Sequence, residues 1–182
     1  MQYSIRKHIH NYAVWSAARA VQRNFTTTAK IKTAIEKTTL RLFAEHPDVT
    51  TIEEFDEIHH SLADQLITAF EKLSVPCSYG RASKIIAVYL KTSVIIPNKG
   101  KSFACQLIHP PIDAILLRNI YADKKIKQMK NLRWTTFDDH KYKEVVSLLR
   151  KEFGECNWKL EKYWSPEQDD STAQISTQQP TR

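Results

Sequence analysis

Three residues that could do chemistry lie in the stretch 73–122: Lys84, Lys91 and Asp113. A lysine amine is a nucleophile once it has lost its proton, and nearby cations or apolar walls favour that loss. A carboxylate held in place can stabilise positive charge that develops in a transition state. We therefore identify Asp113, Lys84 and Lys91 as the catalytic candidates of this sequence.

The elements that position these residues are two helices with an insert between them. Turn-forming residues at 76–80 precede a run whose apolar spacing predicts a helix from about Arg81. Arg81, Lys84 and Lys91 recur at helical spacing and share one face of that helix. The face is either a solvated basic surface or a site that binds a nucleic-acid backbone and carries a reactive lysine.

Asp113 follows the insert 97–108 and the run His109-Pro110-Pro111. Proline is favoured in the first turn of a helix, so a helix is expected to start here with Asp113 in its first turn. A carboxylate at that position complements the positive end of the helix. Asp113 is thus either a helix-start residue alone or a carboxylate aimed into a groove.

The order of these residues resembles the helix-hairpin-helix DNA glycosylase superfamily within residues 73–122. The matching pieces are Gly80-Arg81, Lys84 and Pro111-Ile112-Asp113. The resemblance implies that Lys84 is the Schiff-base lysine and Asp113 the essential acid. Because the lysine-to-aspartate separation is longer here than in the family, Lys91 is the substitute nucleophile.

The charge of the chain favours an anionic partner. The net charge is +7 and the isoelectric point about 9.3. The last 18 residues carry a net charge of −2, which leaves +9 on residues 1–164. Nucleic acid, and DNA in particular, is the expected partner. The candidate contact residues lie beside the turn and in a basic cluster: Tyr79, Gly80, Arg81, Lys124, Lys125, Lys127, Lys130 and Arg133.

The fold class expected is all-α, a compact bundle of about six or seven helices. Glycine is scarce, at three residues, and long segments have helical periodicity, including 10–23, 29–44, 52–73 and 137–153. Trp15 and Leu42 are expected to pack inward. Residues 1–164 should form a single domain, and the polar segment 165–182 reads as a disordered tail.

Several classes of site are not expected. The three cysteines are odd in number and contain no CxxC pair, so neither a disulfide framework nor a cysteine zinc site is predicted. The pair His59-His60 is a poor metal site, and no cofactor is expected. No apolar run of about 18 residues is present, so no membrane partner is predicted. A cytoplasmic location follows as the default.

Three functions remain open from the sequence. The first is a DNA-binding enzyme, either a glycosylase or a glycosylase/AP lyase that removes a damaged or modified base. The second is a helical nucleic-acid-binding or regulatory module without catalysis. The third is a helical protein-interaction protein, for example in a host–virus or toxin system. The first two differ in whether Asp113 lies in a groove beside a lysine.

Overall fold

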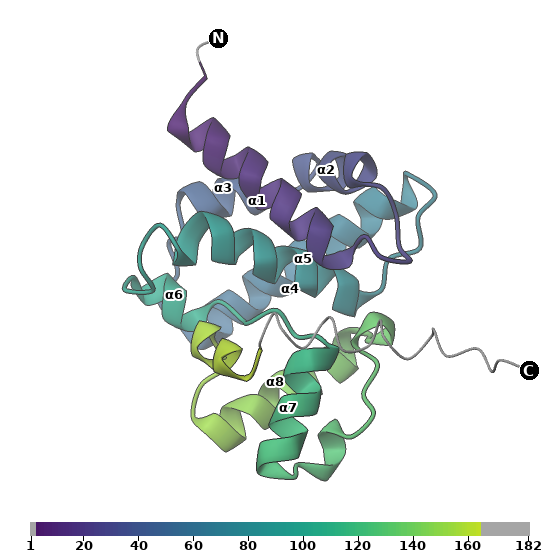
Figure 1. Cartoon of the computed structure of the whole chain (residues 1–182). Coiled ribbons are helices and arrows are strands. Elements are labelled where there is room, and N and C mark those ends of the chain that lie inside the picture. The colour runs from purple at the N-terminus through teal and green to yellow at the C-terminus, as the bar shows by residue number, and fades with distance from the viewer. Residues whose placement is uncertain (1–2, 165–182) are drawn as a thin grey trace, which may run out of the picture.

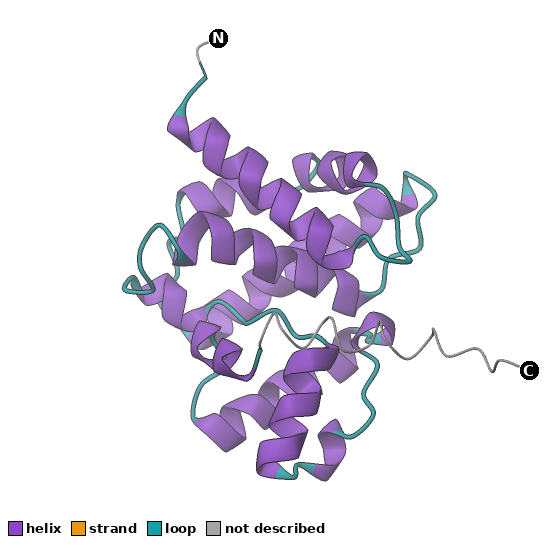
Figure 2. Cartoon of the chain, in the orientation of Figure 1, coloured by secondary structure: helices purple, strands orange, loops and turns teal. Residues whose placement is uncertain are grey.

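The computed structural model describes residues 3–164, and every regular element in that range is helical (Figure 1; Figure 2). The elements in chain order are α1 (Ile5–Val21), α2 (Thr28–Glu36), α3 (Leu40–Glu45), α4 (Ile52–Glu71), α5 (Tyr79–Leu90), η1 (Lys91–Ile95), α6 (Phe103–Leu107), α7 (Ala114–Lys124), η2 (Lys127–Met129), η3 (Trp134–Thr136), α8 (Asp139–Phe153) and η4 (Trp158–Tyr163). Six of these α-helices have nine or more residues, which confirms the all-α prediction. The predicted tail 165–182 lies outside the described residues.

One cluster of buried apolar side chains includes residues from every α-helix described and extends to Leu160 in η4. Helix α5 packs against α1 and α4. Figure 1 shows α1 to α5 gathered in the upper half and α7 and α8 in the lower half. The partly buried stripe of α5 that contains Arg81 and Lys84 is therefore the part of this helix that is left to form a site.

Side-chain caps fix where the helices begin. The hydroxyls of Thr27 and Thr51 each accept a hydrogen bond from the backbone N–H of the third residue of α2 and α4, respectively. Ser78 caps α5 in the same way, by accepting from the Arg81 N–H at 3.2 Å. Helix α5 accordingly begins at Tyr79, two residues before the predicted start.

The predicted helix 29–44 is in fact two helices, because the backbone breaks between α2 and α3. The hydroxyl of Thr38 donates to a backbone carbonyl of α2 at 2.8 Å, and Gln65 accepts from both the backbone N–H and the hydroxyl of Thr39. These bonds replace backbone hydrogen bonds of a continuous helix. The side chains of α3 therefore point in other directions than those of an unbroken helix 29–44 would. The expected burial of Leu42 was therefore wrong, and its side chain is 62% exposed.

The expected packing of Trp15 was also wrong. Its side chain is 51% exposed on the outer face of α1, next to Tyr12. The inner face of α1 presents the small residues Ala13, Ala17 and Ala18, all fully buried. Small residues let α5 approach closely, and a large indole at such an interface would hold the two helices apart.

Helix α7 starts later than expected, at Ala114, so neither the two prolines nor Asp113 lies in its first turn. Asp113 is its N-cap residue, and its Oδ1 accepts hydrogen bonds from the N–H groups of Ile115 and Leu116, both at 3.0 Å. The two prolines lie in the extended segment before it. The insert 97–108 contains the short helix α6. The cap fixes one oxygen of the Asp113 carboxylate and leaves the other free to face α5.

At Gly80, α5 approaches η3 so closely that only glycine fits. A Cβ added here would lie 2.0 Å from the carbonyl oxygen of Trp134 and 3.1 Å from the Cβ of Phe137. The N–H of Gly80 also donates to the Phe137 carbonyl at 3.1 Å. This close backbone contact holds Trp134 beside the basic stripe of α5.

Replacing Gly80 by alanine tests that contact. The added methyl group meets a backbone atom that cannot rotate away, so we expect a loss of about 3 kcal/mol in the free energy of unfolding, measured in urea. Gly154→Ala is the matched control, because Gly154 has a φ of 72° but no atom within 4 Å of the added Cβ. Its expected cost is about 1 kcal/mol. Equal costs for the two variants would contradict the close approach.

Candidate functional site

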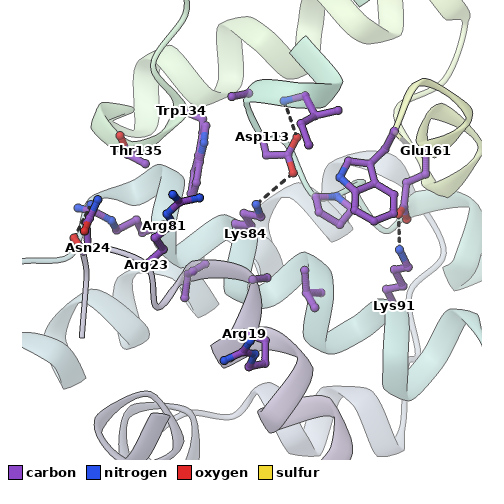
Figure 3. Close-up of a pocket in the computed structure, with 17 residues that line it drawn as sticks. Arg19, Arg23, Asn24, Arg81, Lys84, Lys91, Asp113, Trp134, Thr135 and Glu161 are labelled. Carbon is purple, nitrogen blue, oxygen red and sulfur yellow. Dashed lines mark hydrogen bonds and ion pairs between the residues drawn. The ribbon is translucent and has the colours of Figure 1, made fainter. Parts of the chain in front are cut away.

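A cavity of about 480 Å³ lies where α1, α5, η3, η4 and the start of α7 meet (Figure 3). Its walls contain the three catalytic candidates, Lys84, Lys91 and Asp113, together with Arg81. The stripe predicted on α5 thus forms one side of the cavity. The start of α7 forms the facing side.

Lys84 and Asp113 form an ion pair in the wall of the cavity. The Nζ of Lys84 lies 3.1 Å from Oδ2 of Asp113, and each side chain is only 11% exposed. Because Oδ1 is held by the backbone of α7, the carboxylate cannot turn away from the lysine (Figure 3). Asp113 therefore caps its helix and faces the cavity at the same time.

Lys91 has a different partner. Its ammonium pairs with the carboxylate of Glu161 in η4, 70 residues away in the sequence. Lys91 sits at the end of α5, where the helix widens into the π-helical turn η1. The two lysines thus lie on the same face of α5, but each is bound to its own carboxylate.

The cavity carries an excess of positive charge. Five cationic side chains line it: Arg19, Arg23, Arg81, Lys84 and Lys91. Asp113 and Glu161 neutralise the two lysines, and no carboxylate of the described chain forms an ion pair with the three arginines. Arg81 donates a hydrogen bond to the Asn24 carbonyl at 3.5 Å and lies over the Phe25 ring. The three guanidinium groups therefore keep a positive charge that can attract an anionic ligand.

Aromatic side chains complete the walls. The Nζ of Lys84 lies 4.5 Å from the centroid of the Trp134 ring, and the Nζ of Lys91 lies 5.7 Å from that of Trp164. Both indoles line the cavity. A ring face of this kind can stack on a planar ligand and also stabilise the neighbouring ammonium group.

The predicted nucleic-acid contacts are distributed over three places. Arg81 lines the cavity, whereas Tyr79 and Gly80 are buried and present no side chain to it. Lys124 lies at the far end of α7, about 16 Å from Asp113 by the rise of a helix, and Lys125, Lys127 and Lys130 follow it in the connection that contains η2. Arg133 precedes Trp134 at the edge of η3. The structure thus brings the catalytic candidates together in one cavity, which none of these four lysines lines.

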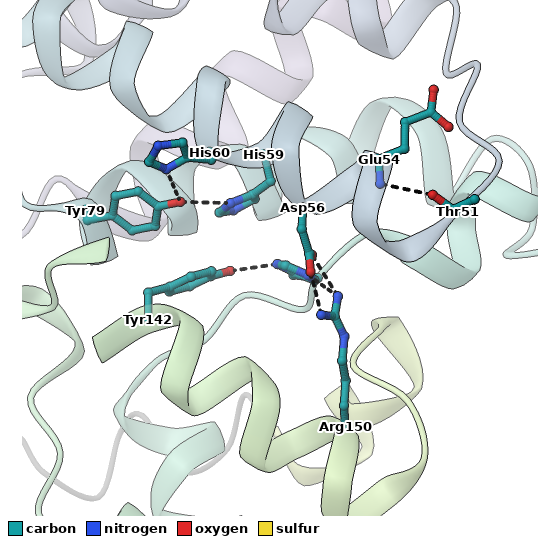
Figure 4. Close-up of polar contacts among 9 residues, drawn as sticks. Thr51, Glu54, Asp56, His59, His60, Tyr79, Tyr142 and Arg150 are labelled. Carbon is teal, nitrogen blue, oxygen red and sulfur yellow. Dashed lines mark hydrogen bonds and ion pairs between the residues drawn. The ribbon is translucent and has the colours of Figure 1, made fainter. Parts of the chain in front are cut away.

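A second group of polar side chains lies inside the protein between α4 and α8 (Figure 4). Asp56 accepts two hydrogen bonds from Arg150, at 2.6 and 2.8 Å. The Nε2 of His109 lies 3.1 Å from the Asp56 carboxylate, and its Nδ1 lies 3.2 Å from the Tyr142 hydroxyl. None of these four side chains lines the cavity. Their arrangement ties α4, α8 and the segment before α7 together.

His59 is the most deeply buried histidine of this group. It is 2% exposed, and its ring stacks on Tyr142 with the centroids 5.0 Å apart. Its Nε2 has no hydrogen-bond partner among the described residues. Burial lowers the pKa of His59 well below its usual value, and the neighbouring His109 adds to that shift. His59 is therefore neutral in the folded protein at neutral pH.

Within residues 3–164 no group of three or more His, Cys, Asp or Glu side chains is placed to hold a metal ion. None of the helices described combines the length and apolar character that crossing a bilayer requires.

Comparisons with protein-family models, with curated proteins and with solved structures found no match.

Sequence reasoning did not identify Trp134 and Glu161 as part of the site. Trp134 directly follows the basic cluster, and an aromatic residue beside cations is a recognisable signal of nucleic-acid binding. Glu161 gives no such signal, because only the tertiary fold brings it to Lys91.

The buried state of His59 predicts how stability depends on pH. In the unfolded chain His59 takes up a proton below about pH 6.5, whereas in the folded protein its lowered pKa keeps the ring neutral. The free energy of unfolding should therefore decrease as pH falls from about 7.5 to about 5.5. His59→Phe removes this proton uptake and should reduce the loss by on the order of 1 kcal/mol, measured by urea unfolding at both pH values. The control His140→Phe, at an exposed position of α8, should retain the wild-type pH dependence. A His59 variant with unchanged pH dependence would contradict the neutral buried ring.

Proposed function

We propose that this protein binds DNA and removes a damaged or modified base, as a DNA glycosylase or glycosylase/AP lyase. The observation that carries the proposal is the Lys84–Asp113 ion pair, 3.1 Å long, in the wall of a basic and aromatic cavity. The resemblance in residues 73–122 implies that Lys84 is the nucleophile and Asp113 the acid. Their contact in the folded chain supports the proposal.

The cavity is suited to a nucleotide taken out of the base stack. Its volume of about 480 Å³ falls within the range of about 300–1,000 Å³ that is common for small-molecule sites. The three arginines can bind phosphate oxygens, and the indoles can stack on a base. Enzymes that act on a base inside a duplex must extrude it, and extrusion requires a pocket of this kind.

Asp113 is placed to stabilise the reacting sugar. When the bond between the base and the sugar C1′ breaks, its electron pair leaves with the base and positive charge develops on the sugar. The Asp113 carboxylate, held by two backbone N–H groups, does not need to reorganise when this charge appears. For simple glycosylase activity, water then attacks C1′.

Lys84 would provide the lyase route. Its nitrogen attacks C1′ after giving up a proton, which Oδ2 of Asp113 can accept and pass to the departing base. The C1′–O4′ bond then breaks, O4′ keeps its electron pair and takes up a proton, and the nitrogen lone pair forms a protonated imine with C1′ of the opened sugar. Lys91 is the second candidate amine, although its partner is Glu161 rather than Asp113.

The second candidate function is a nucleic-acid-binding module without catalysis. One observation favours it: Asp113 already makes two capping hydrogen bonds and an ion pair, as a purely structural residue would. The cavity would then hold a nucleotide without cleaving it. The three cysteines are free thiols, which fits a reducing compartment such as the cytoplasm for either function.

Asp113→Asn distinguishes the two functions. Asparagine keeps the cap but removes the charge, so base release from DNA carrying modified bases should fall about 10²–10³-fold. Asp138→Asn is the matched control, because Asp138 caps α8 by accepting from Lys141 N–H at 2.7 Å and does not line the cavity. This control should retain wild-type base release. Equal activity of both variants and wild type would show that the Asp113 charge takes no part in the reaction.

Borohydride trapping gives a second readout of the same reaction. Reduction of the imine should link wild-type protein to DNA, and the adduct should be lost in Lys84→Ala and retained in Lys91→Ala. The reverse pattern would assign the nucleophile to Lys91. Base release without an adduct would indicate a monofunctional glycosylase. Failure of the wild-type protein to release any modified base would contradict the enzyme proposal and leave the binding module.

A further inference from the structure

The outer face of α1 carries an exposed row of side chains at alternating spacings of three and four residues. The row consists of Ile5, His8, Tyr12, Trp15 and Arg19. Residues at these spacings lie on one side of a helix, and the buried residues of α1 lie on the opposite side. The row therefore faces away from the core.

Tyr12 and Trp15 form an exposed aromatic pair in the middle of this row. Their side chains are 56% and 51% exposed. The two rings stack with their centroids 5.6 Å apart and their planes 24° from parallel. Packing on each other orders the rings and still leaves aromatic surface open, which is what a platform for a planar ligand needs.

The charged residues of α1 and of the segments on either side of it are all cationic. Residues 1–35 contain six lysines and arginines and not one aspartate or glutamate, the first carboxylate being Glu36. Arg19 and Arg23 continue beyond the aromatic pair, and neither forms an ion pair with a carboxylate of the described chain. A ligand for this face should therefore combine negative charge with flat aromatic groups.

The row is continuous with the cavity. Arg19 is one helical step from Trp15 and also lines the cavity, as does Arg23 just past the end of α1 (Figure 3). From Tyr12 to Arg19 the helix rises about 10 Å. A ligand lying over the aromatic pair can therefore extend into the cavity without leaving the protein.

We infer that the outer face of α1, from Tyr12 through Trp15 to Arg19 and Arg23, binds single-stranded nucleic acid. Unpaired bases stack on Tyr12 and Trp15, and the arginines bind the phosphates that lead to the cavity. A single strand offers its base faces to these rings, whereas the bases of a duplex are already stacked on one another. This inference rests on the proposed function for the nucleotide in the cavity, but its binding step does not require catalysis.

Nucleic acid fits the face better than a second protein does. A protein partner covering the row would have to supply carboxylates for Arg19 and Arg23 while burying the aromatic pair. Apart from Ile5, the row has no aliphatic residue of the kind that dominates helix–helix contacts. Charge and aromatic character together thus favour a strand of nucleotides.

The test is binding of the full chain to a labelled single-stranded thymidine oligonucleotide of about 20 nucleotides, followed by fluorescence anisotropy. Tyr12→Ala with Trp15→Ala should weaken binding at least 10-fold, because each stacked base contributes about 1–3 kcal/mol. The matched control is Phe103→Ala, since Phe103 is 57% exposed on α6, and this variant should bind as wild type does. Because the side chains of Tyr12, Trp15 and Phe103 are all exposed, the melting temperature should be the same in these variants as in the wild type.

Salt dependence separates stacking from general charge attraction. The double aromatic variant should keep the wild-type slope of affinity against salt, because it removes no cation. Replacing Lys125, Lys127 and Lys130 together by alanine should flatten that slope and weaken single-stranded and duplex binding alike. A flatter dependence of affinity on salt in the double aromatic variant would instead mean that the two substitutions disturb Arg19 and Arg23.

Two outcomes would overturn the inference. One is wild-type affinity of the double aromatic variant for the oligonucleotide. The other is a wild-type dimer in sedimentation that becomes a monomer in the double variant, which would make the face a contact between copies of the chain. Base release measured on the same preparations keeps the two proposals apart. Binding that depends on Tyr12 and Trp15, without base release, contradicts only the glycosylase proposal. Base release by a protein whose binding does not depend on these two rings contradicts only the proposed role of the outer face of α1.

Discussion

The contact between Lys84 and Asp113 is the constraint on which the arrangement of the cavity depends. Removing two opposite charges from water costs several kcal/mol for each ion, and the attraction between them offsets this only when further polar contacts are made. Here Asp113 receives two backbone N–H bonds and Lys84 lies over the ring of Trp134. The pair thus requires α5, the start of α7 and η3 to meet at one point.

Local signals were sufficient to predict the helical fold and part of the site. The periodicity of Arg81, Lys84 and Lys91 defined a shared face that does line the cavity, because helical spacing is a property of the segment itself. The outward position of Trp15 and the partner of Lys91 were not predictable in this way. Both depend on how closely α1 and η4 approach α5, which only the tertiary structure determines.

Two groups of cationic side chains have different surroundings. At the cavity, Arg81 lies over the ring of Phe25, and Lys84 and Lys91 each lie beside an indole and a carboxylate. Such a setting favours recognition of particular groups. The basic cluster 124–130 is mostly exposed at the other end of α7, where attraction is long-ranged and sensitive to salt. One region is thus suited to holding a nucleotide and the other to attracting a polyanion.

The π-helical turn η1 is a place where a sequence can differ by one residue in length. Its backbone bonds span five residues rather than four, as between the Ile96 N–H and the Lys91 carbonyl at 2.9 Å. The hydroxyls of Thr92 and Ser93 bond to carbonyls of α5 and stabilise the widened turn. A chain one residue shorter here can close the turn with ordinary helical bonds. Related sequences that differ by a single-residue deletion at this position can therefore keep the same core.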